Sequence, residues 1–307
     1  MEVRILEVRL AGGTKAVWRF SGEAACCCLE LIEKVVIPEM LPDMLPVAAQ
    51  VSVGCAPRTP EFPAGWRREE LIHLSPEASV RRRPDGVVEF LLHRTGSDEL
   101  LPLLPRIVWY GFLPQLLKRE AVVAHGALLA RDGSGIVVCG PSGAGKSTCA
   151  RRVPAPWRAL ADDAVLLSAA EDGIYAQGLP TWSRLLPDRT GPRVDVNDRV
   201  ELSGLYHLAQ SPEDRIGTLT GSEAINVVIR SFLDFSGIWK IHPGNALRRD
   251  ISLAAMDFAQ YANRRADTGR LHCTLHGEFW KELEGRLSAA PLIRRSETEA
   301  SYGVSSH

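Results

Sequence analysis

A glycine-rich segment, Gly140-Pro141-Ser142-Gly143-Ala144-Gly145-Lys146-Ser147, has the residue types and spacing of a phosphate-binding loop, and Thr148 follows it. Glycines let the chain turn so that successive backbone N–H groups point at phosphate oxygens. The positive end of a helix that begins directly after the loop adds to this field. In this pattern Lys146 reaches the β- and γ-phosphates and Ser147 offers its hydroxyl to Mg²⁺. The sequence therefore predicts that residues 140–148 bind ATP and Mg²⁺.

Two adjacent carboxylates, Asp162 and Asp163, follow the apolar stretch 157–161. Phosphoryl transfer needs a carboxylate near the metal and often a second one near the attacking hydroxyl, and a strand that ends at an Asp pair supplies both. Asp pairs are also common in turns, so this pair alone favours a site and a turn equally. His125 lies fifteen residues before Gly140. Taken singly, a histidine at a strand start favours a structural role over a catalytic one.

The elements that must position these residues begin near residue 122. Apolar runs at 122–130 and 136–139, joined by the turn Asp132-Gly133-Ser134-Gly135, predict two strands before the loop. A helix should follow from 146, and Pro154 and Pro156 should shorten or bend it. Further strands are predicted at 158–163, 164–168, 173–177 and 271–277, and helices at 224–235, 251–264 and 278–287. Thr220 and Glu223 fit a capping box before the first of these helices.

Residues 1–104 predict a small α+β region in which no residue pattern points to chemistry. Strands are expected at 2–10 and 86–94, a helix at 24–36, and Pro-rich connections from Pro42 to Pro63. One helix over 105–120 should lead into a nucleotide-binding domain at 105–290. The small polar residues of 291–307 predict a mobile tail.

The composition excludes several classes of function. The chain has 307 residues with 36 Lys+Arg and 37 Asp+Glu, a balance that argues against a nucleic-acid coat or an electrostatic membrane binder. The start MEVRILEVRLAGG is not a signal peptide, and every apolar stretch is too short or too charged to span a membrane. The seven cysteines include no CxxC spacing, so we expect reduced thiols and a cytoplasmic location.

Taken together, HGALLARDGSGIVVCGPSGAGKST and the later LADDAV resemble the catalytic domain of HPr kinase/phosphorylase. They also resemble its smaller relatives encoded beside ribosomally made peptides, namely the lasso-peptide kinases and the SynChlorMet cassette proteins. The segment Gly178-Leu179-Pro180-Thr181-Trp182 is similar to a Gly-x-Pro-Trp stretch of these relatives. The resemblance implies an α/β fold, an HPr kinase/phosphoenolpyruvate carboxykinase-like P-loop domain with a small N-terminal α+β region.

The resemblance also implies roles for individual residues. Lys146 and Ser147 would bind nucleotide and Mg²⁺, and His125 would lie beside the phosphates. Asp162 would accept the proton of the substrate hydroxyl, and Asp163 would support the metal. The family's metal-binding Glu after the Asp pair and its glycine-rich substrate loop have no evident counterpart in this sequence.

The leading expectation is an ATP-dependent kinase that phosphorylates a hydroxyl, that of serine, on a peptide or small protein. We name ATP rather than GTP by default, because the loop contacts the phosphates and does not distinguish one base from another. The resemblance leaves a homo-oligomer open, since HPr kinases form hexamers. One alternative is a nucleotide-binding accessory protein of a peptide-modification cluster that catalyses no transfer. A weaker alternative is a phosphorylase or carboxykinase-like activity on pyrophosphate or a small acid.

Overall fold

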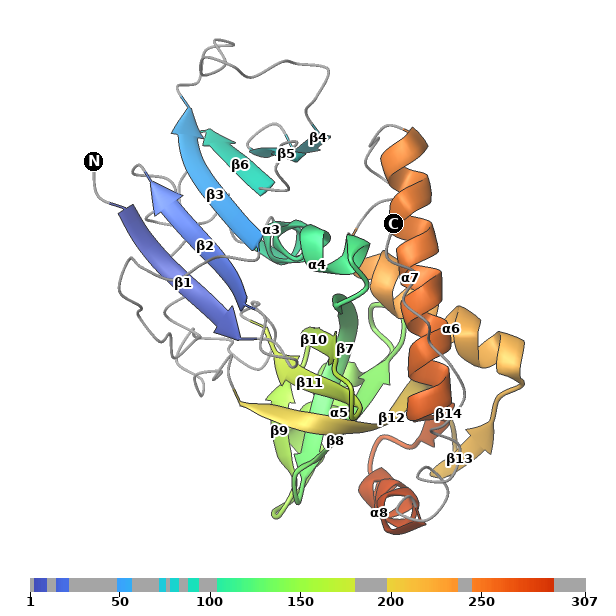
Figure 1. The fold of residues 1–307 in the computed structure, drawn as a ribbon. Helices are drawn as coiled ribbons and strands as arrows, with labels where there is room; N and C mark the ends of the chain where they lie inside the picture. The colour runs from blue at the N-terminus through green and yellow to red at the C-terminus, as the bar shows by residue number, and fades with distance from the viewer. Residues whose placement is uncertain are drawn as a thin grey trace.

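The chain folds into two β-sheets with helices packed against them, a mixed α/β architecture (Figure 1). The computed structural model describes residues 3–9, 15–21, 49–56, 72–75, 78–82, 88–93, 104–179, 198–236 and 245–289. The expected helix over 24–36 and the expected tail over 291–307 lie outside these residues.

The N-terminal sheet has six strands in the order β1-β2-β3-β6-β5-β4. They are β1 Val3–Arg9, β2 Lys15–Ser21, β3 Ala49–Ala56, β4 Ile72–Ser75, β5 Ala78–Arg82 and β6 Val88–His93. The strands predicted at 2–10 and 86–94 are confirmed as β1 and β6. The prediction of connections only between Pro42 and Pro63 is wrong, because β3 lies inside that stretch and pairs with β2 and β6. Prolines flank this strand without interrupting its hydrogen-bonded ladder.

Two short helices join the sheets, α3 Leu104–Gly111 and α4 Leu113–Leu117. The single helix predicted over 105–120 is therefore wrong. Pro114 has no N–H to donate and its ring excludes a regular turn before it, so the chain restarts its helix at this point. The amide of Phe112 bonds the carbonyl of Trp109 at 3.1 Å, as in a tightened last turn. Trp109 and Tyr110 are buried in the same apolar cluster as Phe90 of β6.

The second sheet has eight strands and carries the phosphate loop. Its order is β11-β10-β7-β8-β12-β14-β13, with β9 paired to β7. The start of β12 also pairs with β11, which curls the sheet toward closure. The strands are β7 Ala121–Arg131, β8 Ser134–Cys139, β9 Arg158–Ala161, β10 Ala164–Ala169, β11 Ile174–Gly178, β12 Arg199–Gln210, β13 Arg215–Thr218 and β14 Asp267–Cys273.

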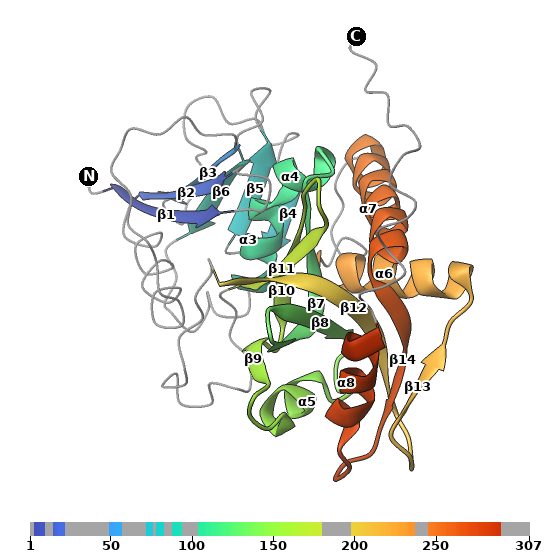
Figure 2. The same cartoon turned by 60° about the horizontal axis from the view of Figure 1, so that its bottom comes forward.

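Helices cover both faces of this sheet, α6 and α7 on one side and α5 and α8 on the other (Figures 1 and 2). They span α5 Lys146–Arg152, α6 Gly221–Ser236, α7 Asn245–Arg265 and α8 Phe279–Ala289. Successive residues of a strand point to opposite faces. In β8, Val137 therefore packs in the core under α6 and α7, whereas Val138 packs in the core under α5 and α8.

Most elements predicted after residue 120 are confirmed. Helix α5 is short, ending at Arg152 before Pro154, as the prolines indicated. The capping box forms: the Thr220 amide donates to Glu223 at 2.9 Å, and the Glu223 amide donates to the Thr220 hydroxyl at 3.4 Å. Strands β12 and β13 were not predicted, and the late strand lies at 267–273 instead of 271–277.

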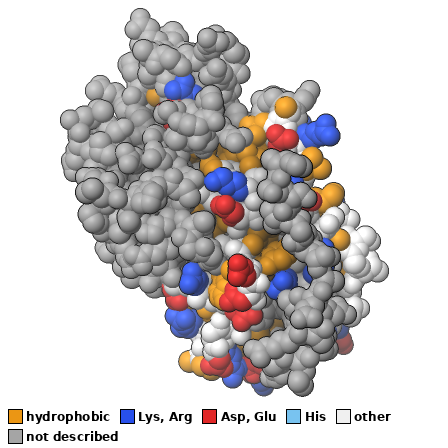
Figure 3. All heavy atoms as spheres, in the orientation of Figure 1, with side chains coloured by type: hydrophobic (Ala, Val, Ile, Leu, Met, Phe, Trp, Pro, Cys, Tyr) orange, Lys and Arg blue, Asp and Glu red, His pale blue; other side chains and the backbone are white. Residues whose placement is uncertain are grey.

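Figure 3 shows one face of the molecule. On its described part, acidic and basic side chains lie next to each other among hydrophobic ones, so neither sign of charge dominates. This agrees with the formal net charge of −1. Among the described residues, no helix combines the length and the apolar character that crossing a membrane would require.

Candidate active site

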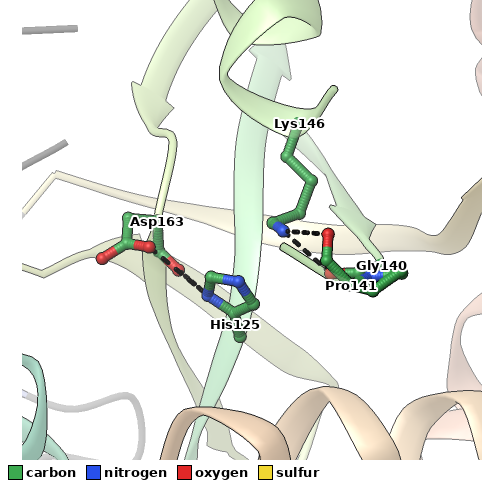
Figure 4. Close-up of polar contacts among 5 residues, drawn as sticks. All are labelled: His125, Gly140, Pro141, Lys146 and Asp163. Carbon is green, nitrogen blue, oxygen red and sulfur yellow. Dashed lines mark hydrogen bonds and ion pairs between the residues drawn. The ribbon is translucent and has the colours of Figure 1, made fainter. Parts of the chain in front are cut away.

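The phosphate loop connects the buried strand β8 to helix α5. The backbone of Gly145, at the N-cap of α5, has a φ of 112°, a conformation that L side chains rarely adopt. Lys146 begins the helix, and its side chain turns back over the loop (Figure 4). Its ammonium donates to the carbonyl oxygens of Gly140 at 2.8 Å and Pro141 at 3.0 Å. The loop therefore holds one cation at its centre.

Lys146 is almost completely buried, with a relative exposure of 6%. Burial lowers the pKa of its ammonium below the ordinary 10.5, and the negative charge of Asp163 opposes this shift most strongly. Weaker opposition to the pKa shift comes from Cys139, Asp234 and Asp162. A phosphate group placed in the loop would supply the negative charge that this buried ammonium needs.

The Asp pair lies between two strands that both pair with β7. Strand β9 ends opposite Leu128, where Ala161 pairs, and β10 begins opposite His125, where Ala164 pairs. Asp162 and Asp163 occupy the two positions between them, so one long strand fixes both carboxylates. Asp162 is 5% exposed, and the side chain of Asp163 is 23% exposed.

His125 lies beside Asp163 in Figure 4. Its Nδ1 is 3.1 Å from the carbonyl oxygen of Asp163 and 3.4 Å from the carboxylate Oδ1. Both oxygens only accept hydrogen bonds, so Nδ1 carries a proton in this arrangement. The adjacent Gly126 donates its amide to the same carbonyl at 3.0 Å. A Cβ at Gly126 would lie 2.9 Å from Val137, which explains why glycine follows the histidine.

These groups line one polar cavity of about 250 Å³, which we call the phosphate cavity. Its lining residues are His125, Ser142, Gly143, Gly145, Lys146, Ser147, Thr148, Arg151, Asp162 and Asp163. The structure thus brings together three sequence segments that were predicted to act together. Gly140 and Pro141 instead contribute the carbonyls that hold Lys146, and Ala144 faces a different cavity.

Arg151 was not identified from the sequence as a site residue, although it lines the phosphate cavity. It lies four residues after Ser147 and three after Thr148 on α5. Residues at these spacings share one helix face, so the signal was present once the helix was accepted. Its exposed guanidinium adds a second cation to the cavity wall.

The cavity offers Mg²⁺ a hydroxyl, from Ser147, and the carboxylates of Asp162 and Asp163. Mg²⁺ prefers oxygen ligands and is usually held by one or two carboxylates together with substrate phosphates and water. This donor set fits such an ion. Within the part of the chain that the structure describes, no three His, Cys, Asp or Glu side chains gather into a metal site of their own. The nucleotide would therefore have to supply part of the coordination.

A comparison with protein families identifies the family to which the chain belongs. The sequence model described as SynChlorMet cassette protein ScmC matches residues 98–288, which is more than half of the chain and includes the whole phosphate cavity. Among the curated proteins, none matches the chain.

Proposed function

The chain belongs to the SynChlorMet cassette protein ScmC family, and from the contents of the phosphate cavity we propose that it is an ATP-dependent kinase. The phosphate acceptor is a hydroxyl, that of serine, on a peptide or small protein. One observation carries this proposal: a buried lysine in a phosphate loop, two carboxylates and a histidine line the same cavity. This set of groups can bind a triphosphate, neutralise it and remove a proton from an acceptor.

We further assign the sheet and its loop to the HPr kinase/phosphoenolpyruvate carboxykinase-like P-loop fold. Support comes from the order of elements along the chain: a strand bearing His125, a hairpin, the loop with α5, and then the Asp pair. It also comes from the resemblance of these segments to HPr kinase. The α/β architecture and the helices on both faces are compatible with this assignment.

In the proposed reaction, the acceptor oxygen forms a bond to the γ-phosphorus while the bond from that phosphorus to the β–γ bridging oxygen breaks. The acceptor proton passes to a carboxylate oxygen of Asp162, and ADP leaves with the bridging oxygen. Lys146 and Arg151 balance the negative charge of the phosphates. The Nε2 edge of His125 orients the phosphate group, with Asp163 fixing the ring through Nδ1. Bound Mg²⁺, held by Ser147 and Asp163, would add neutralising charge.

The first experiment replaces Lys146 by Ala and measures transfer of labelled γ-phosphate to peptides encoded next to the gene. Transfer should fall below detection, because the only cation inside the loop is lost, while circular dichroism should show that the variant remains folded. Lys281→Ala is the matched control, since this lysine is exposed on α8, forms an ion pair with Glu278 at 2.7 Å and does not line the phosphate cavity. Undiminished transfer by a folded Lys146→Ala protein would rule the kinase out.

The accessory-protein alternative retains support from one observation. The carboxylates that line the phosphate cavity among the described residues are those of Asp162 and Asp163. The resemblance to HPr kinase implies a further metal-binding Glu after the Asp pair, and the chain has the buried apolar Leu179 in that part of the sequence. A protein of this kind would bind nucleotide without transferring phosphate. Nucleotide binding with no transfer to any neighbouring peptide would favour this alternative.

A further inference from the structure

A second cavity of about 640 Å³ lies on the other side of the phosphate loop. We call it the apolar cavity, because Leu208, Pro212, Leu275 and the thiols of Cys149 and Cys273 form much of its wall. It adjoins the phosphate cavity, and both are lined by Gly143, Gly145 and Thr148. A ligand that fills one can therefore extend past these three residues into the other.

The direction of that extension follows from the chemistry of the loop. Its backbone N–H groups hold the α- and β-phosphates of a nucleotide, and its lysine reaches the β- and γ-phosphates. Lys146 and the Asp pair line only the phosphate cavity. The γ-phosphate end therefore belongs there, and the α-phosphate end lies near Thr148, at the entrance to the apolar cavity.

The apolar cavity has the properties of a small-molecule site. Its volume lies within the usual range of about 300–1,000 Å³, and apolar groups predominate, with polar groups from Gln210, Ser211 and Thr274 among them. Leu275 at its edge is 67% exposed, the highest value among the large hydrophobic side chains that the structure describes as exposed. A leucine so exposed next to an apolar hollow gains free energy when a flat apolar ligand covers it.

The segment that carries Leu275 is fixed in place. Arg152 donates to the carbonyl of Thr274 at 2.8 Å and also to that of Gly277. Its guanidinium lies 5.4 Å from the ring centre of Phe279 on α8. The amide of Thr274 donates to Asp214 at 2.6 Å. This wall of the cavity is therefore preorganised, which reduces the entropy cost of binding a ligand against it.

We propose that the apolar cavity holds the base and ribose of the nucleotide, with Leu275 and Pro212 in contact with the base. This inference rests on the proposed nucleotide binding in the phosphate cavity. It specifies in addition on which side of the loop the nucleoside lies. Tripolyphosphate, which has the phosphates without the nucleoside, should then use the phosphate cavity alone. The two ligands separate the two cavities experimentally.

The test measures the affinities of ATP and tripolyphosphate by calorimetry with Mg²⁺ present, using the full chain. Wild type should bind ATP more tightly. Leu275→Ser should weaken ATP roughly fivefold through lost apolar contact and leave tripolyphosphate unchanged. Gln210→Trp, at an exposed position of the lining, should fill the cavity and weaken ATP by about tenfold or more. Leu253→Ser is the matched control, because Leu253 is 47% exposed on α7 and does not line the cavity.

The outcomes separate the inference from the proposal beneath it. If wild type binds both ligands and neither variant changes the ratio of their affinities, the nucleoside lies elsewhere and the inference is overturned. The same holds if Leu275→Ser changes only the KM for the acceptor peptide. If wild type binds neither ligand, nucleotide binding itself fails, and the inference fails with it. ATP binding that is selectively weakened in both variants supports the inference, whether or not phosphate is transferred.

Discussion

The two cavities on either side of the phosphate loop differ in the groups that form their walls. Charged groups dominate the wall of the phosphate cavity, with a lysine, an arginine, a histidine and two carboxylates. In the apolar cavity, leucines, a proline and two thiols predominate over one arginine and a few uncharged polar side chains. Charged groups stabilise developing charge on phosphate most strongly where their geometry is fixed and water is limited. Apolar groups can hold a base without reading its edge. The comparison separates groups suited to chemistry from groups suited to affinity.

Helix α5 divides the two environments, and two neighbouring arginines mark the division. Arg151 lines only the phosphate cavity, and Arg152 lines only the apolar one. Arg151 is exposed, whereas Arg152 is half-buried among Phe279, Trp280 and backbone carbonyls. Because successive residues on a helix point about 100° apart, the two adjacent arginines face different cavities.

The largest expected effect separates chemistry from binding inside the phosphate cavity. Asp162→Asn should lower the rate of phosphate transfer about 10²- to 10⁴-fold, because the amide cannot accept the acceptor's proton, while ATP affinity stays within about threefold. Single-turnover transfer and calorimetry measure the two quantities. Asp172→Asn is the control, since Asp172 is an exposed turn residue that accepts a hydrogen bond from Tyr175 at 2.7 Å. Undiminished transfer by Asp162→Asn would remove this residue from the mechanism.

The neighbouring arginines give the next largest effect. Arg152→Ala should lower the free energy of unfolding by about 1–3 kcal/mol, because hydrogen bonds from a charged group to two carbonyls are lost. It should also reduce the preference for ATP over tripolyphosphate, since the segment bearing Leu275 loses its anchor. Arg151→Ala should leave the free energy of unfolding within about 0.5 kcal/mol of wild type. It should lower the affinities for ATP and tripolyphosphate by the same factor.

Urea denaturation and calorimetry on the two arginine variants check this contrast. Each variant is the control for the other, because they remove the same side chain from adjacent positions. Equal destabilisation by both substitutions would show that α5 does not divide the two cavities in the way described.

The phosphate loop was predictable because its determinants are local, whereas the roles of the Asp pair and His125 were expected only from the resemblance to HPr kinase. The loop occupies eight consecutive residues, and the Asp pair and His125 each adjoin an apolar run that reads as a strand. Their meeting point required only that two strands pair with β7. Predicting Arg151 required one further step, namely recognising that it lies on the same helix face as Ser147 and Thr148.

The apolar cavity was not predictable, because the wall that faces the loop and α5 comes from the ends of β12 and β14 and the residues after them, which are far apart in the sequence. Strand β12 pairs in parallel with β14 on one side and with β8 on the other. Strand β12 itself escaped detection. A register shift between Leu202 and Gly204 interrupts the period of two by which a half-buried strand is identified. The break between α3 and α4 was missed for a different reason, since apolar residues continue across it.

The smallest expected effect is the number of protons taken up when ATP binds. This uptake should depend on the phosphate cavity and not on the apolar cavity. Burial lowers the pKa of Lys146 in the unliganded protein, and bound phosphates raise that pKa again. ATP binding should therefore take up a fraction of a proton, increasing as the pH approaches the ordinary value of 10.5. In that range the Lys146 side chain binds more protons in the unfolded chain than in the free native protein, so the contribution of Lys146 to the free energy of unfolding should rise with pH. Calorimetry at pH 7 and 9, in buffers of different ionisation enthalpy, measures the uptake.

Lys146→Arg should abolish the uptake, because a guanidinium stays protonated throughout this range. Leu275→Ser should weaken ATP and keep the wild-type uptake, since it alters only the apolar cavity. An uptake that persists in Lys146→Arg would assign the proton to another group. An uptake lost in Leu275→Ser would show that the two cavities do not act separately, because a change in the wall that contacts the base would then have altered the electrostatics at the phosphates.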